Sequence, residues 1–211
     1  MHDADPIAVP VGEQAERSVR WGLGDCVVGW LLAQVGAILA TGIVLAVTDT
    51  DFDDLSIGAI ALAQTGLWVG MFGVPWVATR LKGNGLVRDL GLRFKPADLL
   101  YVFLGVACQY ALVLVYVPLF WLTDVDADDL SAPARDLTDR AHGGVGIALL
   151  LLVVGVGAPI FEEIFYRGLV QRSFIRRLGT WPGLVVTALI FGAVHFQLLQ
   201  FVSLALFGAG S

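Results

Sequence analysis

Long apolar runs separated by short polar segments dominate the sequence. Each run is close to the length of about 20 apolar residues that crosses the hydrocarbon core of a bilayer. The pattern predicts an all-α fold, a polytopic transmembrane helical bundle with five full spans plus a partial sixth. We expect the full spans at residues 23–48, 56–79, 99–122, 145–170 and 181–197, and the partial span from residue 198.

Composition agrees with a protein embedded in a lipid bilayer. Hydrophobic residues make up 57% of the chain and charged residues only 15%, with a mean hydropathy of +0.77, which is far from the mix of an ordinary soluble domain. The net charge of −6 comes largely from Asp-rich loops and does not suggest a nucleic-acid partner. Cys26 and Cys108, the only cysteines, fall in predicted spans, so we expect small buried thiols rather than a disulfide.

Loop charges predict the orientation of the chain. Segments 48–55 and 123–144 are acidic, whereas segments 80–96 and 167–179 are rich in Arg and Lys. By the positive-inside rule, the basic loops and the N-terminus are cytoplasmic in a multi-pass protein of the cell (plasma) membrane. We expect three parts: a polar cytoplasmic tail (1–22), two transmembrane helices with a basic cytoplasmic loop (23–97), and a second membrane domain (98–211).

Two groups of residues near the predicted span ends suggest contact with the membrane surface. Tryptophans concentrate at bilayer interfaces, and we expect this of four of them: Trp21, Trp76, Trp121 and Trp181. Arginines beyond the fourth span predict an anchor at the cytoplasmic surface, with contact to anionic lipid: Arg172, Arg176 and Arg177.

The stretch "APIFEEIFYRGLV" (158–170) places charge inside an apolar span. A charged side chain at the centre of a transmembrane helix costs about 2.5 to 3.5 kcal/mol on insertion scales, so such residues usually face the bundle interior. Glu163 can pair with Arg167, four positions later on the same helical face. Glu162 points about 100° away and should project with Tyr166 and Leu169. A purely structural ion-pair cluster remains the alternative.

A histidine on the next predicted span is the candidate partner of Glu162. His195 lies in "ALIFGAVHFQ", and counting residues from the basic turn places it at a depth similar to that of Glu162. A lone His among apolar residues is more often a packed core residue than a catalyst. A carboxylate and an imidazole in a polar pocket are nevertheless suited to holding and deprotonating a water molecule. They are also metal ligands, although two fall short of the three usual at catalytic zinc.

These residues resemble a known family. "EEIFYR" is similar to the Glu-Glu-x-x-x-Arg motif, and "FGAVH" to the Phe-x-x-x-His motif, of the CPBP intramembrane proteases, also called the CAAX protease and bacteriocin-processing or Abi family. The resemblance implies an intramembrane endopeptidase in residues 98–211 that acts on a membrane-associated peptide or protein. It also implies that Glu162 activates water, that His195 holds water or a metal, and that Glu163 with Arg167 braces the site. Zn²⁺ at Glu162 and His195 and a metal-free mechanism both stay open.

The sequence departs from the family pattern in one respect. The family has a further helix with a second His, whereas this sequence has no His after His195. We therefore expect a domain that is incomplete at its C-terminus, and weak activity or none as truncated.

The alternative to a protease is a non-catalytic membrane protein. It would be either a scaffold or immunity factor that would tolerate Glu162→Gln, or a transporter with intramembrane carboxylates.

Overall fold

The computed structural model describes residues 18–93, 95–100, 103–105, 107, 110, 111, 114 and 127–194. Within these ranges the chain is helical and has no β-strand. The elements, with η marking 3₁₀- and π-helical segments, are α1 (Leu23–Thr48), η1 (Phe52–Asp54), α2 (Ile57–Lys82), α3 (Leu86–Leu90), α5 (Ala127–Arg140), α6 (Gly143–Leu150), η2 (Leu151–Gly157), α7 (Ala158–Glu162), η3 (Glu163–Gln171), α8 (Arg172–Leu178) and α9 (Thr180–Val194).

In the described part of the chain, three helices are long and apolar enough to cross a membrane: α1, α2 and the helix Gly143–Leu178. The last runs without interruption from α6 to α8 and is called the long helix below. Helix α9 is apolar but shorter, with 15 residues in the described part. The predicted first, second and fourth spans are thereby confirmed as helices. Residues 195–211 and most of 99–122 lie outside the described residues, so the count of five spans plus a partial sixth stays a prediction.

Two segments that the sequence suggested as loops are helical instead. The long helix continues through the basic stretch to Leu178 and ends at Gly179, whose φ of +86° suits a residue without a Cβ. Arginine is a good helix former, so charge alone does not end a helix. In the acidic loop, α5 forms, and its Arg140 donates hydrogen bonds to the carbonyl oxygens of Phe52 (3.4 Å) and Leu55 (3.3 Å).

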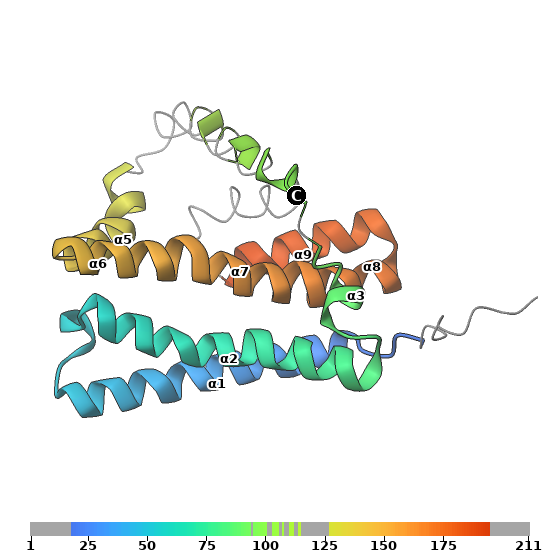
Figure 1. Cartoon of the computed structure of the whole chain (residues 1–211), viewed down its shortest axis with the longest axis horizontal. Coiled ribbons are helices and arrows are strands. Elements are labelled where there is room, and N and C mark those ends of the chain that lie inside the picture. The colour runs from blue at the N-terminus through green and yellow to red at the C-terminus, as the bar shows by residue number, and fades with distance from the viewer. Residues whose placement is uncertain are drawn as a thin grey trace, which may run out of the picture.

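Helices α1 and α2 form an antiparallel hairpin that packs through small residues. A Cβ added at Gly66 would overlap the backbone carbonyl of Gly36, and one added at Gly70 would overlap the backbone of Ala33, which is itself fully buried. Small residues at such positions let two helix backbones approach closely, which is a common way for helices to associate in lipid. Figure 1 shows the two helices lying together along one side of the long helix.

The hairpin packs against the long helix through large aromatic side chains of both elements. Phe165, 1% exposed, lies over Gly29 of α1, where a Cβ would stand 2.6 Å from the ring. Trp68 of α2 stacks on Phe161 with ring centroids 4.5 Å apart. The Sγ of Cys26 lies 3.4 Å from the Oγ of Ser173, so this cysteine is buried and free, as expected; Cys108 lies outside the described residues. These contacts fix the rotation of the long helix about its axis.

A polar cluster joins the residues next to the hairpin to the C-terminal end of the long helix. It consists of Trp21, Asp89 and Arg176, and we call it the Trp21 cluster. The indole Nε1 of Trp21 donates to Asp89 Oδ2 at 2.8 Å. The guanidinium of Arg176 stacks over the same indole, 3.8 Å from its centroid, and donates to the Trp21 carbonyl oxygen at 2.7 Å. Three segments distant in sequence therefore meet around one indole.

The contacts of the Trp21 cluster differ from two predictions, namely that Trp21 lies at the bilayer interface and that Arg176 serves as an anchor at the membrane surface. Trp21 is 2% exposed, so it is a buried residue and not an interfacial one, because Asp89 satisfies its N–H inside the protein. Arg176 binds the chain itself rather than serving only as a lipid anchor. Trp76 and Trp181 are exposed, as interfacial residues would be. Trp121 lies outside the described residues.

Candidate active site

The two glutamates lie midway along the long helix, at the junction of α7 and η3. Glu162 is the last residue of α7 and Glu163 the first of η3, and α7 is flanked on both sides by π-helical segments. Pro159 has no N–H to donate to the preceding turn, and the N–H of Ala158 bonds to Val153, five residues earlier, instead of four. Single π-helical turns inside α-helices occur frequently at functional sites.

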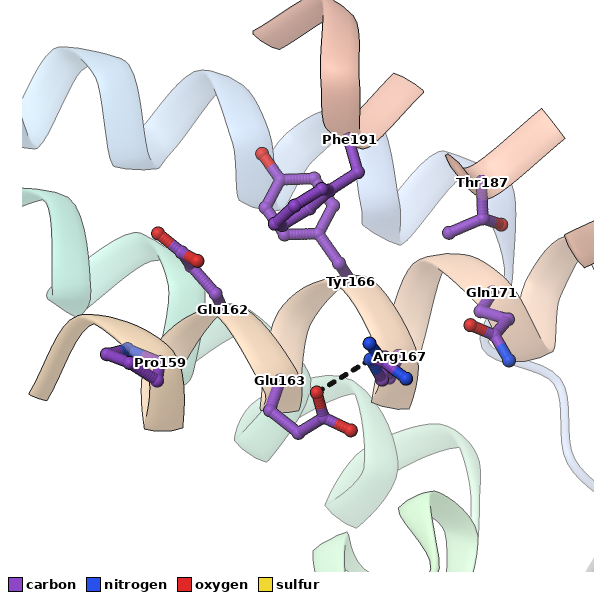
Figure 2. A pocket seen from close by; sticks show the side chains of 8 residues that line it. All are labelled: Pro159, Glu162, Glu163, Tyr166, Arg167, Gln171, Thr187 and Phe191. Atoms are coloured by element: carbon purple, nitrogen blue, oxygen red, sulfur yellow. Dashed lines mark ion pairs between the residues drawn. The ribbon is translucent and has the colours of Figure 1, made fainter. Parts of the chain in front are cut away.

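Glu163 and Arg167 form the ion pair that their spacing predicted. Arg167 Nε lies 2.7 Å from Glu163 Oε2, and the two side chains are 18% and 57% exposed, respectively. Figure 2 shows this pair on one face of the helix. The pair leaves the Glu163 carboxylate matched by a positive charge on its own helix, so neither residue requires a partner from another element.

Glu162 projects from a different face, as the helical periodicity predicted. Figure 2 shows its carboxylate on the same side of the helix as the ring of Tyr166 and the side chain of Phe191 from α9. Tyr166 is 4% exposed and packs edge-to-face on Phe191, with ring centroids 5.2 Å apart. Leu169, expected on this face, is fully buried against the hairpin. Glu162 itself is half-buried, so its carboxylate stands at the border between the packed core and the pocket described next.

These side chains surround a small pocket between the long helix and α9. Its volume is about 90 Å³, which leaves room for a few water molecules. The structure therefore brings together three of the four predicted site residues, both glutamates and the arginine. The lining is Pro159, Glu162, Glu163, Tyr166, Arg167 and Gln171 from the long helix, and Thr187 and Phe191 from α9.

The fourth predicted residue, His195, lies outside the described residues, so its meeting with Glu162 is not tested. The phenylalanine of "FGAVH", Phe191, does line the pocket. In the described ranges no three His, Cys, Asp or Glu side chains come together as metal ligands. Among the described residues, the pocket offers two glutamates as metal ligands, which do not make a zinc site by themselves. Zinc at Glu162 and His195 stays a prediction.

Sequence reasoning missed two polar residues that line the pocket, Gln171 and Thr187. Gln171 could have been found, because it continues the four-residue spacing of Glu163 and Arg167 by one more step. Thr187 carries no local signal, since its hydroxyl donates to the carbonyl oxygen of Gly183 (2.8 Å) as in any apolar helix. It lines the pocket only because α9 packs against the long helix.

Comparison with known proteins relates one part of this chain to a known family. Residues 144–210 match the family model described as type II CAAX prenyl endopeptidase Rce1-like, a match that begins within the long helix and includes both glutamates and α9. Over these residues the chain is therefore similar to the Rce1-like family. The match confirms the resemblance to CAAX proteases, a family of membrane endopeptidases. No curated protein and no solved structure matched the chain significantly.

The segment that matches the Rce1-like model thus places a charged pocket between two apolar helices. One carboxylate, Glu163, is held by Arg167, whereas Glu162 lies on the face shared with Tyr166 and α9. Two adjacent carboxylates in different surroundings can take different roles, one structural and one chemical. A half-buried carboxylate beside room for water is suited to general base chemistry.

Proposed function

We propose that this protein is an intramembrane endopeptidase that hydrolyses a peptide bond of a membrane-associated peptide or protein. The observation that carries the proposal is the position of Glu162, which lines a water-sized pocket midway along an apolar helix, beside the Glu163–Arg167 ion pair. The match of residues 144–210 to a membrane endopeptidase family supports the same reading.

In the proposed mechanism, Glu162 acts as the general base. Its carboxylate takes a proton from a water molecule while the water oxygen bonds to the carbonyl carbon of the substrate. The carbon–nitrogen bond then breaks, and the leaving nitrogen receives the proton from Glu162. His195 follows Phe191 by four positions, so on a continuing helix it would share the pocket-facing side and hold the attacking water. Glu163 and Arg167 brace the helix at the site.

The family description supports the proposed substrate class, and the charge distribution of the chain supports its proposed orientation. A CAAX-type peptide is the first candidate. A bacteriocin or leader peptide, which the motif resemblance implies, is the second. The acidic turn of the hairpin lies beside α5, and the basic residues around α3 lie near α8 at the opposite end (Figure 1). This separation supports a cytoplasmic N-terminus in the cell membrane by the positive-inside rule.

Cleavage of defined peptides by the full chain in liposomes tests the proposal. The probes are an internally quenched farnesylated CAAX peptide, its unprenylated counterpart and a leader peptide. Glu162→Gln should lower turnover by about 10²- to 10⁴-fold, the usual contribution of a general base, and His195→Ala should lower it as well. Asp136→Asn, which alters an exposed carboxylate on α5, should have no effect. A membrane-permeant chelator in the same assay tests the zinc prediction.

Two results would count against hydrolysis. One is undiminished turnover after Glu162→Gln. The other is a wild-type protein, expressed from its complete gene, that cuts none of the three peptides. Either would favour the non-catalytic alternative, in which the charged pocket serves a scaffold or transport role.

A further inference from the structure

The pocket extends beyond the proposed catalytic residues, toward the end of the long helix at which the Trp21 cluster lies. Gln171 and Thr187 line this extension, and the mechanism above uses neither. Figure 2 shows both residues at the end of the pocket away from Glu162, one on the long helix and one on α9. Two polar residues from different helices therefore line the same pocket.

The hydrogen-bonding capacity of these two side chains is only partly used. Gln171 is half-buried, and in the part of the chain that the structure describes its amide makes no hydrogen bond. Thr187 is 3% exposed and donates its hydroxyl proton to Gly183, which leaves its oxygen able to accept. A primary amide both donates and accepts, so the pair matches the N–H and C=O of one peptide unit. The whole pocket has a volume of about 90 Å³, so its extension has room for no more than a group of that size.

The distance between this extension and Glu162 defines which part of a substrate would reach it. Gln171 follows Glu162 by nine residues of the π-helical segment η3, which rises less per residue than an α-helix, so the two lie no more than about 13 Å apart along the helix axis, the value for a rise of 1.5 Å per residue. An extended peptide advances about 3.3 Å per residue, so this distance corresponds to at most about four residues of substrate. We propose that Gln171 and Thr187 form a backbone-binding subsite that holds the substrate chain at most about four residues from the scissile bond. This inference rests on the proposed endopeptidase function.

Binding and cleavage measured in parallel test the subsite. The probe is the farnesylated CAAX peptide with a fluorescent label, and its Kd is measured by anisotropy on the full chain in detergent. Gln171→Leu should weaken binding and raise KM by about 5- to 20-fold, as expected for one or two neutral hydrogen bonds, with kcat little changed. Thr187→Val should give a smaller loss in the same direction. Gln64→Leu, the same change in α2 outside the pocket lining, is the matched control.

Peptides with a single N-methylated backbone amide add a readout that a merely structural role would not move. One position, at most about four residues from the scissile bond, should lose affinity for the wild type but not for Gln171→Leu. An equal effect of N-methylation on both proteins, or an unchanged Kd for Gln171→Leu, would overturn the subsite even if Glu162→Gln abolishes cleavage. If Glu162→Gln leaves cleavage intact, the proposed role of Glu162 in hydrolysis is refuted. The subsite is then tested only by the Kd of the peptide for the wild type and for Gln171→Leu. A wild-type protein that does not bind the peptide overturns the subsite.

Discussion

Arg176→Ala tests whether the Trp21 cluster holds the N-terminal hairpin against the long helix. The substitution removes a guanidinium stacked 3.8 Å from the indole centroid and a hydrogen bond of 2.7 Å to the Trp21 carbonyl. A cation–π contact at an exposed site contributes about 0.5 to 1 kcal/mol. A hydrogen bond from a charged group contributes about 1.5 to 3 kcal/mol, and the lower end applies because Arg176 is at the surface. We expect a loss of about 2 kcal/mol in the free energy of separating the two elements.

Cys26 provides the assay for that separation. Its thiol is 7% exposed and lies between α1 and the long helix, against Ser173 and the Leu169 carbonyl, so a reagent reaches it only when the two elements part. In a Cys108→Ala background, the rate of reaction with N-ethylmaleimide reports local opening under native conditions. A loss of about 2 kcal/mol raises the open population, and with it the labelling rate, by about 30-fold.

Arg177→Ala is the matched control, because it removes the adjacent arginine, for which the structure gives no hydrogen bond or ion pair in the described ranges. It should leave the labelling rate of Cys26 within about twofold of the wild type. If Arg176→Ala labels at the wild-type rate, the stacked arginine does not hold the hairpin. If Arg177→Ala accelerates labelling equally, general surface charge rather than the Trp21 cluster is responsible.

Two further predictions concern the hairpin itself. Gly66→Leu places a side chain against the backbone of Gly36, which cannot move aside, and should destabilise the protein by about 3 kcal/mol or more. Thermal unfolding in detergent measures the loss, and an unchanged Tm would contradict the close approach of α1 and α2. Lys82→Ala breaks the 2.6 Å ion pair with Asp25, in which the lysine side chain is 47% exposed, and should cost no more than about 1 kcal/mol and less at high salt. A larger or salt-independent loss would show that this pair is not a surface contact.

The sequence predicted the helices well because apolar runs with clear breaks define them. The first predicted span has the bounds of α1, between Gly22 and the Asp-rich turn, and the second was three residues short of Lys82. The pairing of Glu163 with Arg167 followed from spacing on one helix. The end of the long helix was missed because the basic residues before Gly179 suggested a loop, although arginine supports helix well.

Contacts between distant segments could not be predicted in the same way. Trp21 meets Asp89 across 68 positions and Arg176 across 155, and no periodic pattern connects residues so far apart. The sequence therefore placed Trp21 at the lipid interface, where isolated tryptophans usually lie. Thr187 likewise became a pocket residue only through the packing of α9 on the long helix.

The packing of the hairpin on the long helix bears on how far the site can be transplanted. The family match begins at residue 144, so α1 and α2 lie before it. Yet Trp68 supports Phe161, the neighbour of Glu162, and Gly29 accommodates the ring of Phe165. A chimera that joined residues 144–211 to the first helices of another membrane protein would keep every motif residue and lose the surface that sets their rotation. Exchange of domains in this protein should therefore keep residues 18–93 together with the matched segment.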